Sequence, residues 1–440
     1  MINLKALREN PQPFREAAQL KNKDIDFDRI IELDKLVRTL QQQFQEIAAQ
    51  KNAASQEIAQ ASGEEREEKI AAMREVSERA DEIKDQLSPA QDELQELLYR
   101  IPNLIMEDVP VGKDESENVE IRRIGDPKVF DFEPKDHIEL GKLHNMIDTE
   151  KAAQVSGARF TYLKNGAARL QLALMQFVVD TLTNEETLKT IIGEAGLDVT
   201  STPFQFVIPP VMIKPEPYRR MARLSEEVED ERYFLQQDNM YLIGSAEHTL
   251  GPLHMDEILK HEDLPIRYLG YSPAFRREAG SYGKDTRGII RQHQFDKLEM
   301  ESFADKDTSL AEQNFFVAIQ EYLVNQLNIP YRVMMICTGD IGTPDARQID
   351  IECWIPTQKT YRETHTADLM TDYQARRLNT RYKDGEGETH FVHMNDATAF
   401  AIGRILVAIM ENGQMANGNI TIPEILVPYM GGQMTLSHTA

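Results

Sequence analysis

Two long stripes of apolar residues near the start of the chain constrain its fold more than any other feature. From Asp28 onward, apolar side chains recur at spacings of three and four, which places them on one face of a helix. The first series, interrupted only by Lys51, comprises Ile30, Leu33, Val37, Leu40, Phe44, Ile47, Ala54 and Ile58. The second series follows a polar break at residues 62–65 and comprises Ile70, Met73, Val76, Ala80, Ile83, Leu87, Ala90, Leu94 and Leu97. Two such helices joined by a short turn at Gly63 are predicted to fold back as an antiparallel coiled coil.

The predicted hairpin is longer than a local packing element needs to be. At 1.5 Å per residue, the helix from Ile30 to Ile58 alone spans ~40 Å, which indicates a projecting arm. A dimerisation coiled coil or a spacer would show the same periodicity. Residues 28–100 carry 10 Lys and Arg against 17 Asp and Glu, so their charge does not indicate an RNA partner. The periodicity predicts the hairpin and leaves its partner open.

A second domain is predicted after the hairpin. The second helix should end at residues 100–103, because Pro102 cannot continue it. Residues 109–118 are polar and rich in turn formers, and are interpreted as a linker, so we predict an arm over residues 1–110 and a second domain over residues 111–440. Strand-like and helix-like runs alternate in the second domain, which predicts an α+β fold on a mostly antiparallel sheet flanked by helices. The strand-like runs are residues 202–208, 240–243 and 331–336, and the helix-like runs are residues 166–182 and 308–327.

Composition and charge exclude several classes of function. The chain has 440 residues, of which 41% are hydrophobic and 28% charged, as expected of a folded protein of several domains. It lacks both an apolar run of ~18 residues and a signal peptide, so we expect a soluble, cytoplasmic protein without a membrane partner. Its two cysteines, Cys337 and Cys353, cannot form a disulfide framework or a four-thiolate zinc site. The net charge of -24 argues against non-specific nucleic-acid binding, so DNA is not an expected partner, and an RNA would have to be met by local basic clusters.

The segment from Phe275 to Glu299 is the most informative for chemistry. It consists of a strand that ends in Phe-Arg-Arg-Glu, a glycine-rich loop over residues 280–288, and a returning strand. Its arginines could hold a polyanion, Phe295 could stack on a flat ring, and Glu278 and Glu299 could accept hydrogen bonds from amines or hydroxyls. A charged surface hairpin would contain the same residue types, so this segment alone does not distinguish a ligand-binding site from an ordinary surface.

Two later segments carry further polar groups. Residues 361–366 offer the carboxylate of Glu363 and two hydroxyls beside an arginine, a set of hard oxygen ligands suited to Mg²⁺ near phosphates, although an ordinary strand end would explain them too. Residues 395–404 combine small side chains with the fixed positive charge of Arg404 just before an apolar helix. The chain contains no glycine-rich loop of the Walker or Rossmann kind, so ATP recognition by those folds is excluded.

Taken together and in this order, these segments resemble the class II aminoacyl-tRNA synthetases, and bacterial-type seryl-tRNA synthetases in particular, over nearly the whole chain. The general class II motifs match at Pro210 within residues 208–212, at residues 275–299, and at Gly403-Arg404. The seryl branch is indicated by the segments 109–118, 245–247 (Ser-Ala-Glu, where the family has Thr-Ala-Glu) and 280–288. The resemblance implies a homodimer, and it implies that the hairpin embraces the long variable arm of serine tRNA.

The resemblance also implies roles for individual residues in ATP binding. Arg276 would bind the α-phosphate, Glu278 the adenine amino group and Arg404 the γ-phosphate, with Phe295 stacked on the adenine. Glu363, supported by Thr366, would bind Mg²⁺. The catalytic residues implied are Arg276, Glu363 and Arg404, and the remaining ATP-binding residues implied are Arg277, Thr364 and His365.

Serine would bind beside the ATP site. The resemblance places its amino group against Ser245, Ala246 and Glu247, and its hydroxyl against Glu299 and Thr398. Buried partners for a hydroxyl would penalise alanine, which leaves them unpaired. The reaction implied is attack of the serine carboxylate on the α-phosphorus of ATP, followed by transfer of serine to the terminal adenosine of tRNA(Ser). Whether tRNA(Sec) is a second acceptor stays open.

No residue is needed as a nucleophile or a general base in this reaction, because positioning and charge neutralisation lower the barrier. The histidines His293, His365 and His393 are therefore expected to be structural.

Two departures from the family pattern raise expectations of their own. Family members commonly have Ser-Cys-Ser after the Mg²⁺ glutamate, whereas this chain has Thr366-Ala367-Asp368, and Ser245 replaces the usual threonine. Thr366 and Ser245 keep a hydroxyl, so activity is expected to survive. Asp368 is expected to add a negative charge near the phosphates.

Three alternatives to this interpretation remain. A class II homologue that loads an amino acid onto a carrier protein would lack the long arm. A non-catalytic RNA-binding paralogue would have no need of a complete ATP and Mg²⁺ site. A coiled-coil scaffold would account for the first hundred residues alone.

Overall fold

The computed structural model describes residues 2–225, 228–279 and 287–438. These residues form two compact units, one of residues 2–102 and a larger one that begins at Asn103. The side chain amide of Asn103 donates hydrogen bonds to the carbonyl oxygens of Pro344 (2.9 Å) and Met370 (2.7 Å), which fixes the start of the larger unit. The division therefore falls ahead of the predicted limit at residue 110.

The predicted linker over residues 109–118 is part of the larger unit. The backbone N–H of Thr338 donates to the carbonyl oxygen of Pro110 (2.9 Å), and that of Cys337 donates to Oδ1 of Asn118 (2.9 Å). Polar, turn-rich composition did not reveal that these turns exchange hydrogen bonds with a neighbouring loop of the larger unit.

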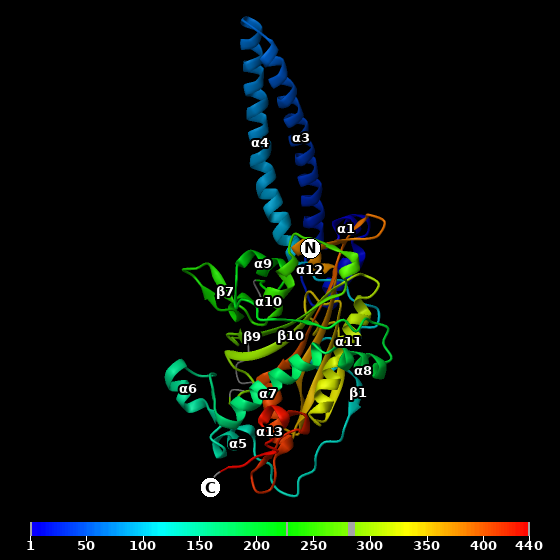
Figure 1. Cartoon of the computed structure of the whole chain (residues 1–440). Helices are drawn as coiled ribbons and strands as arrows, with labels where there is room; N and C mark the ends of the chain where they lie inside the picture. Colours follow the sequence, from blue (N-terminus) through cyan, green and yellow to red (C-terminus); the bar gives the residue numbers. More distant parts are fainter. Residues whose placement is uncertain (1, 226–227, 280–286, 439–440) are drawn as a thin grey trace. The chain divides into compact units, whose positions relative to one another are not determined.

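The smaller unit consists mainly of the predicted helical hairpin, which Figure 1 shows as two long helices running side by side. Helix α3 spans Phe27–Gln60 and helix α4 spans Glu64–Arg100, after two short helices, α1 (Leu4–Glu9) and α2 (Gln12–Leu20). The Asp26 side chain accepts a hydrogen bond from the N–H of Arg29 and so caps α3. The turn between the long helices contains Gly63 at φ 61°, a left-handed conformation that favours glycine. The prediction of an antiparallel hairpin is confirmed.

The apolar seam of the hairpin is tightest away from the turn. The predicted stripe residues that are buried are Ile30, Leu33, Val37, Leu40, Ile47, Ala80, Ile83, Leu87, Ala90 and Leu94. The seam then continues to Leu98, four residues after Leu94, instead of to the predicted Leu97. Near the turn the seam opens, and Ile70 is 39% exposed. An ion pair between Arg29 and Glu93 joins the two helices (Nη2 to Oε2, 2.8 Å).

The larger unit is built on an eight-stranded sheet in the order β1-β11-β12-β13-β16-β10-β9-β4. Every described pair of neighbouring strands in it is antiparallel except β4 with β9. The strands are β1 (Val119–Ile124), β11 (Tyr331–Met335), β12 (Arg347–Ile355), β13 (Thr360–Thr371), β16 (His393–Ala401), β10 (Gln294–Ala304), β9 (Ile266–Phe275) and β4 (Gln205–Val207). The predicted mostly antiparallel α+β domain is thus confirmed.

The main apolar core includes buried side chains of four helices that are labelled in Figure 1. They are α7 (Asn165–Leu182), α8 (Glu185–Ala195), α11 (Ser309–Gln326) and α13 (Ile402–Gly413). Helices α7 and α11 correspond to the two predicted helix-like runs. Among the described residues, no helix is both long and apolar enough to span a membrane.

The sheet parts between β13 and β16, and a buried glutamine bridges the gap. Within the described strands, their pairing runs from Thr371 with Met394 to Ala367 with Ala397 and goes no further toward Thr366 and Thr398. The fully buried side chain of Gln320, in α11, donates to the carbonyl oxygens of Thr366 and Thr398 at 2.8 Å each. Gln320 thus satisfies two carbonyl groups that strand pairing would otherwise satisfy.

We predict that Gln320→Met, which keeps the length of the side chain and removes both donors, lowers the free energy of unfolding by ~1–3 kcal/mol, because two buried carbonyl groups lose their partners. Urea denaturation followed by fluorescence of the single tryptophan, Trp354 in β12, reports on this sheet. The control Gln326→Met, in the last turn of the same helix, should change stability by less than ~0.5 kcal/mol. Equal effects of the two substitutions would show that the bridge does not stabilise the sheet.

Candidate active site

A cavity occupies the opening between β13 and β16, next to the start of α13. Two β-bulges set which side chains reach it. Thr364 is an extra residue in β13, between His365 paired with Ile351 and Glu363 paired with Glu352. Ala399 is likewise extra in β16, between the pairs of Thr398 and Phe400 with β10. The residues that line the cavity are Arg276, Glu278, Ile289, Ile290, Arg291, Gln292, Phe295, Lys297, Glu363, Thr364, Thr366, Thr398, Ala401, Gly403 and Arg404.

One end of the cavity is cationic. Arg276 follows β9 directly, its Nε donates to the carbonyl oxygen of Gly244 (3.1 Å), and its guanidinium lies 5.3 Å from the centre of the Phe295 ring. Burial, together with the nearby charges of Arg232 and Arg404, holds the pKa of Arg276 below its ordinary value. Positive groups that repel one another in this way favour binding of an anion. The contribution of Arg232 was not predicted, because no pattern links it to the segment 275–299.

Glu278 and Arg277 differ in how they relate to the cavity. Glu278 lines it, its Oε2 accepts a hydrogen bond from Nη1 of Arg291 (3.2 Å), and its backbone has φ 52°, a strained conformation for a residue other than glycine. Arg277, also predicted to bind ATP, packs over the ring of Tyr233 at 5.8 Å and is outside the lining that the described residues form. Of the predicted glycine-rich loop, residues 280–286 lie outside the described residues.

The two predicted Mg²⁺ ligands both face the cavity. The Oγ1 of Thr366 is buried without a hydrogen-bond partner among the described residues, and the carboxylate of Glu363 contacts Nη1 of Arg404 (2.7 Å). Cross-strand neighbours on β12 add two carboxyl groups, since Glu352 pairs with Glu363 and Asp350 pairs with Thr366. An unpaired hydroxyl beside a half-exposed carboxylate is a donor set of hard oxygens, which fits Mg²⁺.

His365 does not reach the cavity. The bulge at Thr364 turns its side chain into the apolar core, where it lies 5.6 Å from the ring of Phe400 and is 1% exposed. Burial lowers the pKa of His365 to about 3, so the ring is neutral at neutral pH. His365 was predicted both as an ATP-binding residue, implied by the resemblance, and as a structural histidine. Its position in the core agrees with the structural role, whereas Thr364 lines the cavity.

The other end of the site is anionic and contains the predicted serine residues. Glu299 in β10 pairs directly with Thr398 in β16, so these two side chains share one face of the sheet. The hydroxyl of Ser245 donates to Oε2 of Glu299 (2.9 Å). Ser245 and Ala246 precede the short helix α10 (Glu247–Leu250), which approaches β9 closely at Gly270. A Cβ on Gly270 would lie 3.0 Å from the Cβ of Ala246 and closer still to Leu250.

Lys297 is a further site residue that the sequence interpretation missed. It is 6% exposed, lines the cavity, forms an ion pair with Glu299, and donates from Nζ to the Ser245 hydroxyl (3.3 Å). Lys297 could have been predicted from the sequence, because it is two residues from Glu299 on a strand and residues two apart on a strand face the same side of the sheet. Burial raises the pKa of Glu299, and Lys297 opposes that shift.

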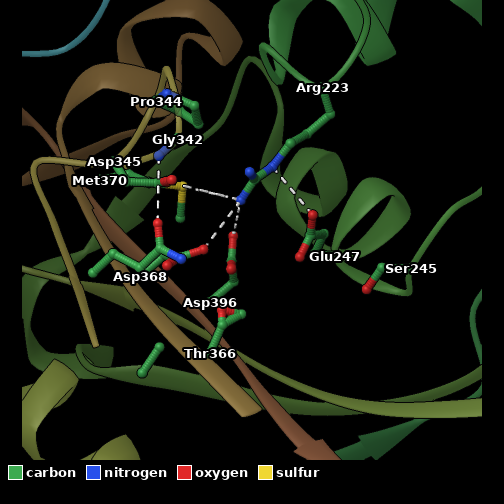
Figure 2. A network of polar contacts seen from close by, with 12 residues as sticks. Arg223, Ser245, Glu247, Gly342, Pro344, Asp345, Thr366, Asp368, Met370 and Asp396 are labelled. Carbon is green, nitrogen blue, oxygen red and sulfur yellow. Dashed lines mark hydrogen bonds and ion pairs between the residues drawn. The ribbon is translucent and has the colours of Figure 1, made fainter. Parts of the chain in front are cut away.

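A buried carboxylate cluster lies at this anionic end. One carboxylate oxygen each of Glu247, Glu299 and Asp396 lies within 4.8 Å of the other two, which is close enough to surround a cation. Figure 2 shows Arg223 beside this cluster, between Glu247 and the aspartates.

Asp368, expected to lie near the phosphates, lies instead on the Arg223 side of the cluster. Its Oδ2 is 3.8 Å from Nη2 of Arg223, and it pairs across the sheet with Asp396. Burial and the neighbouring carboxylates of Asp345 and Asp396 raise the pKa of Asp368 well above its ordinary value. Asp368 is not part of the cavity lining that the described residues form. Asp368 is two residues further along β13 than Thr366, beyond the point where the strands part.

Comparisons with known proteins agree with this geometry. Residues 1–105 match the family model described as seryl-tRNA synthetase N-terminal domain, and residues 228–413 match the model of the tRNA synthetase class II core domain (G, H, P, S and T). A serine–tRNA ligase of Petrotoga mobilis is 42% identical over 98% of this chain and 99% of its own length. A solved seryl-tRNA synthetase of Pyrococcus horikoshii, complexed with ATP, is 34% identical and covers 100% of both chains with a TM-score of 0.86. A solved cytoplasmic serine–tRNA ligase of Naegleria fowleri, in complex with AMP, is 28% identical with a TM-score of 0.83, over 100% of this chain and 99% of its own. The chain belongs to the seryl-tRNA synthetase family.

Proposed function

We propose that this protein activates serine with ATP and transfers it to tRNA(Ser). The observation that carries the proposal is the separation of charge within one site. Arg276, Arg232 and Arg404 lie near enough to repel one another, where a triphosphate would bind. Glu247 and Glu299 belong to a buried carboxylate cluster, where an amino acid with a hydroxyl would bind. A polyanion and an ammonium group must meet within one site to form an aminoacyl-adenylate.

In the first step, the serine carboxylate attacks the α-phosphorus, and pyrophosphate leaves. Arg276 stabilises the charge that develops on the α-phosphate, and Arg404 neutralises the departing phosphates. Phe295 stacks on the adenine, and Glu278 accepts a hydrogen bond from its amino group. Glu363 and Thr366 would hold Mg²⁺, which supplies further neutralisation of phosphate charge. No side chain forms a covalent bond with the substrate.

Serine is recognised at both of its polar ends. Glu247 binds the ammonium group, beside Ser245, and the paired residues Glu299 and Thr398 bind the hydroxyl. Oε1 of Glu299 has no hydrogen-bond partner among the described residues, so it is available to the substrate hydroxyl. Alanine would leave this buried acceptor unsatisfied, which disfavours it. Threonine would be rejected for lack of room for its methyl group.

In the second step, the terminal adenosine of tRNA(Ser) takes serine from the adenylate. The hairpin of α3 and α4 binds the long variable arm of that tRNA and so holds its acceptor end for reaction. We also propose that the protein is a cytoplasmic homodimer. Exposed apolar side chains support a protein partner. They are Leu172 on α7 (63% exposed) and, near Pro210 in sequence, Phe206 (41%) and Ile208 (72%).

The proposed function is tested by ATP–pyrophosphate exchange with each of the twenty amino acids. Serine should support exchange, and alanine and threonine should do so at least about 100-fold less well, as expected when a buried polar pocket or a steric limit discriminates. Exchange with a different amino acid would contradict the assignment of the pocket. A folded protein without exchange would indicate a non-catalytic member of the family.

The role of the arm is tested by removing Lys35 to Ala90 and joining the ends with a short Gly/Ser linker. Because the two units are separately compact, serine-dependent exchange should persist in this variant. Charging of tRNA(Ser) should fall by at least about 100-fold, because the excised surface orients the RNA. Charging close to that of the full chain would mean that the hairpin is a spacer or an assembly element.

A further inference from the structure

Three acidic side chains lie side by side across the centre of the sheet. Asp396 in β16 pairs with Glu301 in β10 on one side and with Asp368 in β13 on the other. All three are buried, with Glu301 and Asp396 at most 1% exposed. Carboxylates placed directly opposite each other on a sheet destabilise it unless they are neutral or paired with a cation. These three acids therefore require a nearby positive charge or must be protonated.

Arg223 supplies the compensating charge. It follows helix α9 (Pro215–Arg220) in the chain, its side chain is 16% exposed, and its guanidinium lies between Glu247 and a group of aspartates. Nη2 donates to Oδ2 of Asp396 (2.7 Å), while Nε lies 3.1 Å from Oε1 of Glu247. Figure 2 shows this arrangement, with Arg223 reaching Glu247 on one side and Asp396 on the other. One guanidinium thus links the row of acids to the residue that we assign to the substrate ammonium group.

The charges divide unequally between these two partners. Burial, Glu247 and Glu299 raise the pKa of Asp396 well above its ordinary value, against the opposing effect of Arg223. Burial also raises the pKa of Glu247, but Arg223 and then His248 and Lys297 outweigh it and hold that pKa well below its ordinary value. The contact with Arg223 therefore favours the ionised form of Glu247.

His248 touches Glu247 without replacing Arg223. Its Nε2 lies 3.3 Å from Oε1 of Glu247, the same oxygen that Arg223 contacts. Burial lowers the pKa of His248 to about 3, so it contributes a hydrogen bond and no charge at neutral pH. Among the described residues, no partner contacts Oε2 of Glu247, which leaves that oxygen for a ligand.

We propose that Arg223 is a positioning residue of the amino-acid pocket, which fixes Glu247 through one carboxylate oxygen so that the other binds the ammonium group of serine. This inference rests on the proposed function. Lys297, which pairs with Glu299 in the same cluster, would repel a divalent ion there more strongly than a singly charged ammonium group. Neither Arg223 nor Glu247 belongs to the cavity lining that the described residues form. Arg223 would reach the substrate through its direct contact with Glu247.

The test is the kinetics of serine-dependent pyrophosphate exchange in Arg223→Met. The KM for serine should rise at least about tenfold, whereas kcat and the KM for ATP should stay within about twofold, as expected when substrate binding alone is weakened. Arg223→Lys, which keeps a charge near Glu247, should recover most of the affinity for serine. The matched control is Arg220→Met, three residues earlier, whose side chain is 15% exposed and pairs with Glu216 and Asp256 outside the pocket. It should leave the KM for serine unchanged.

A second variant separates the two contacts of Arg223. If Arg223→Met does not fold, Arg223→Met with Asp396→Asn removes the unpaired acid as well, and this double variant should fold and still show the raised KM for serine. A folded variant without Arg223 that keeps the wild-type KM for serine would overturn the proposal, and so would an equal loss of affinity for ATP. If the unmodified protein does not activate serine, the proposed function fails instead, before Arg223 is tested.

Discussion

The parting of β13 from β16 is the constraint on which the rest of the site depends. An antiparallel ladder that continued would join Thr366 and Thr398 by backbone hydrogen bonds and would close the cavity. Instead, one side chain of α11, Gln320, satisfies both carbonyl groups from beneath the sheet. The strands can then separate without leaving buried carbonyl groups unpaired.

The two bulges make use of this opening. An extra residue reverses the alternation of side chains along a strand, so Glu363 and Thr366 face the cavity together although they are three residues apart. The same shift in β16 brings Thr398 and Ala401 to one side, immediately before α13 presents Arg404. The backbone irregularities place phosphate-binding and serine-binding groups around one cavity.

Charge is then distributed along the cavity by neighbours that lie outside it. Burial and neighbouring guanidinium groups hold the pKa of Arg276 below its ordinary value, and Arg223 opposes the effect of burial on the pKa of Glu247. A buried carboxylate without a cation would take up a proton and lose its attraction for an ammonium group. The opposite characters of the two ends therefore depend on Arg232 and Arg223 as much as on the residues that touch the substrates.

Much of the fold could be predicted from the sequence, because its strongest signals are local. The periodicity over residues 28–100 predicted the hairpin, and the strand-loop-strand at Phe275 to Glu299 matches β9 and β10. The sequence interpretation failed where a residue contacts a partner that is distant in sequence, or where a β-bulge interrupts the alternation of side chains along a strand. The resemblance placed His365 with the ATP residues, and the bulge at Thr364, which turns the His365 side chain into the core, leaves no mark in the sequence. Arg223 was missed because only folding brings it to Asp396. The linker over residues 109–118 was misjudged because its hydrogen-bond partners lie more than two hundred residues away.

The most direct test of the account is a crystal structure of the protein with a sulfamoyl analogue of seryl-adenylate. The account predicts the ammonium group within about 3 Å of Glu247 and the serine hydroxyl at that distance from Glu299 and Thr398, with the adenine on Phe295 and the sulfamoyl group at Arg276. A serine side chain directed away from Glu299, or an ammonium group that contacts none of the clustered carboxylates, would contradict it.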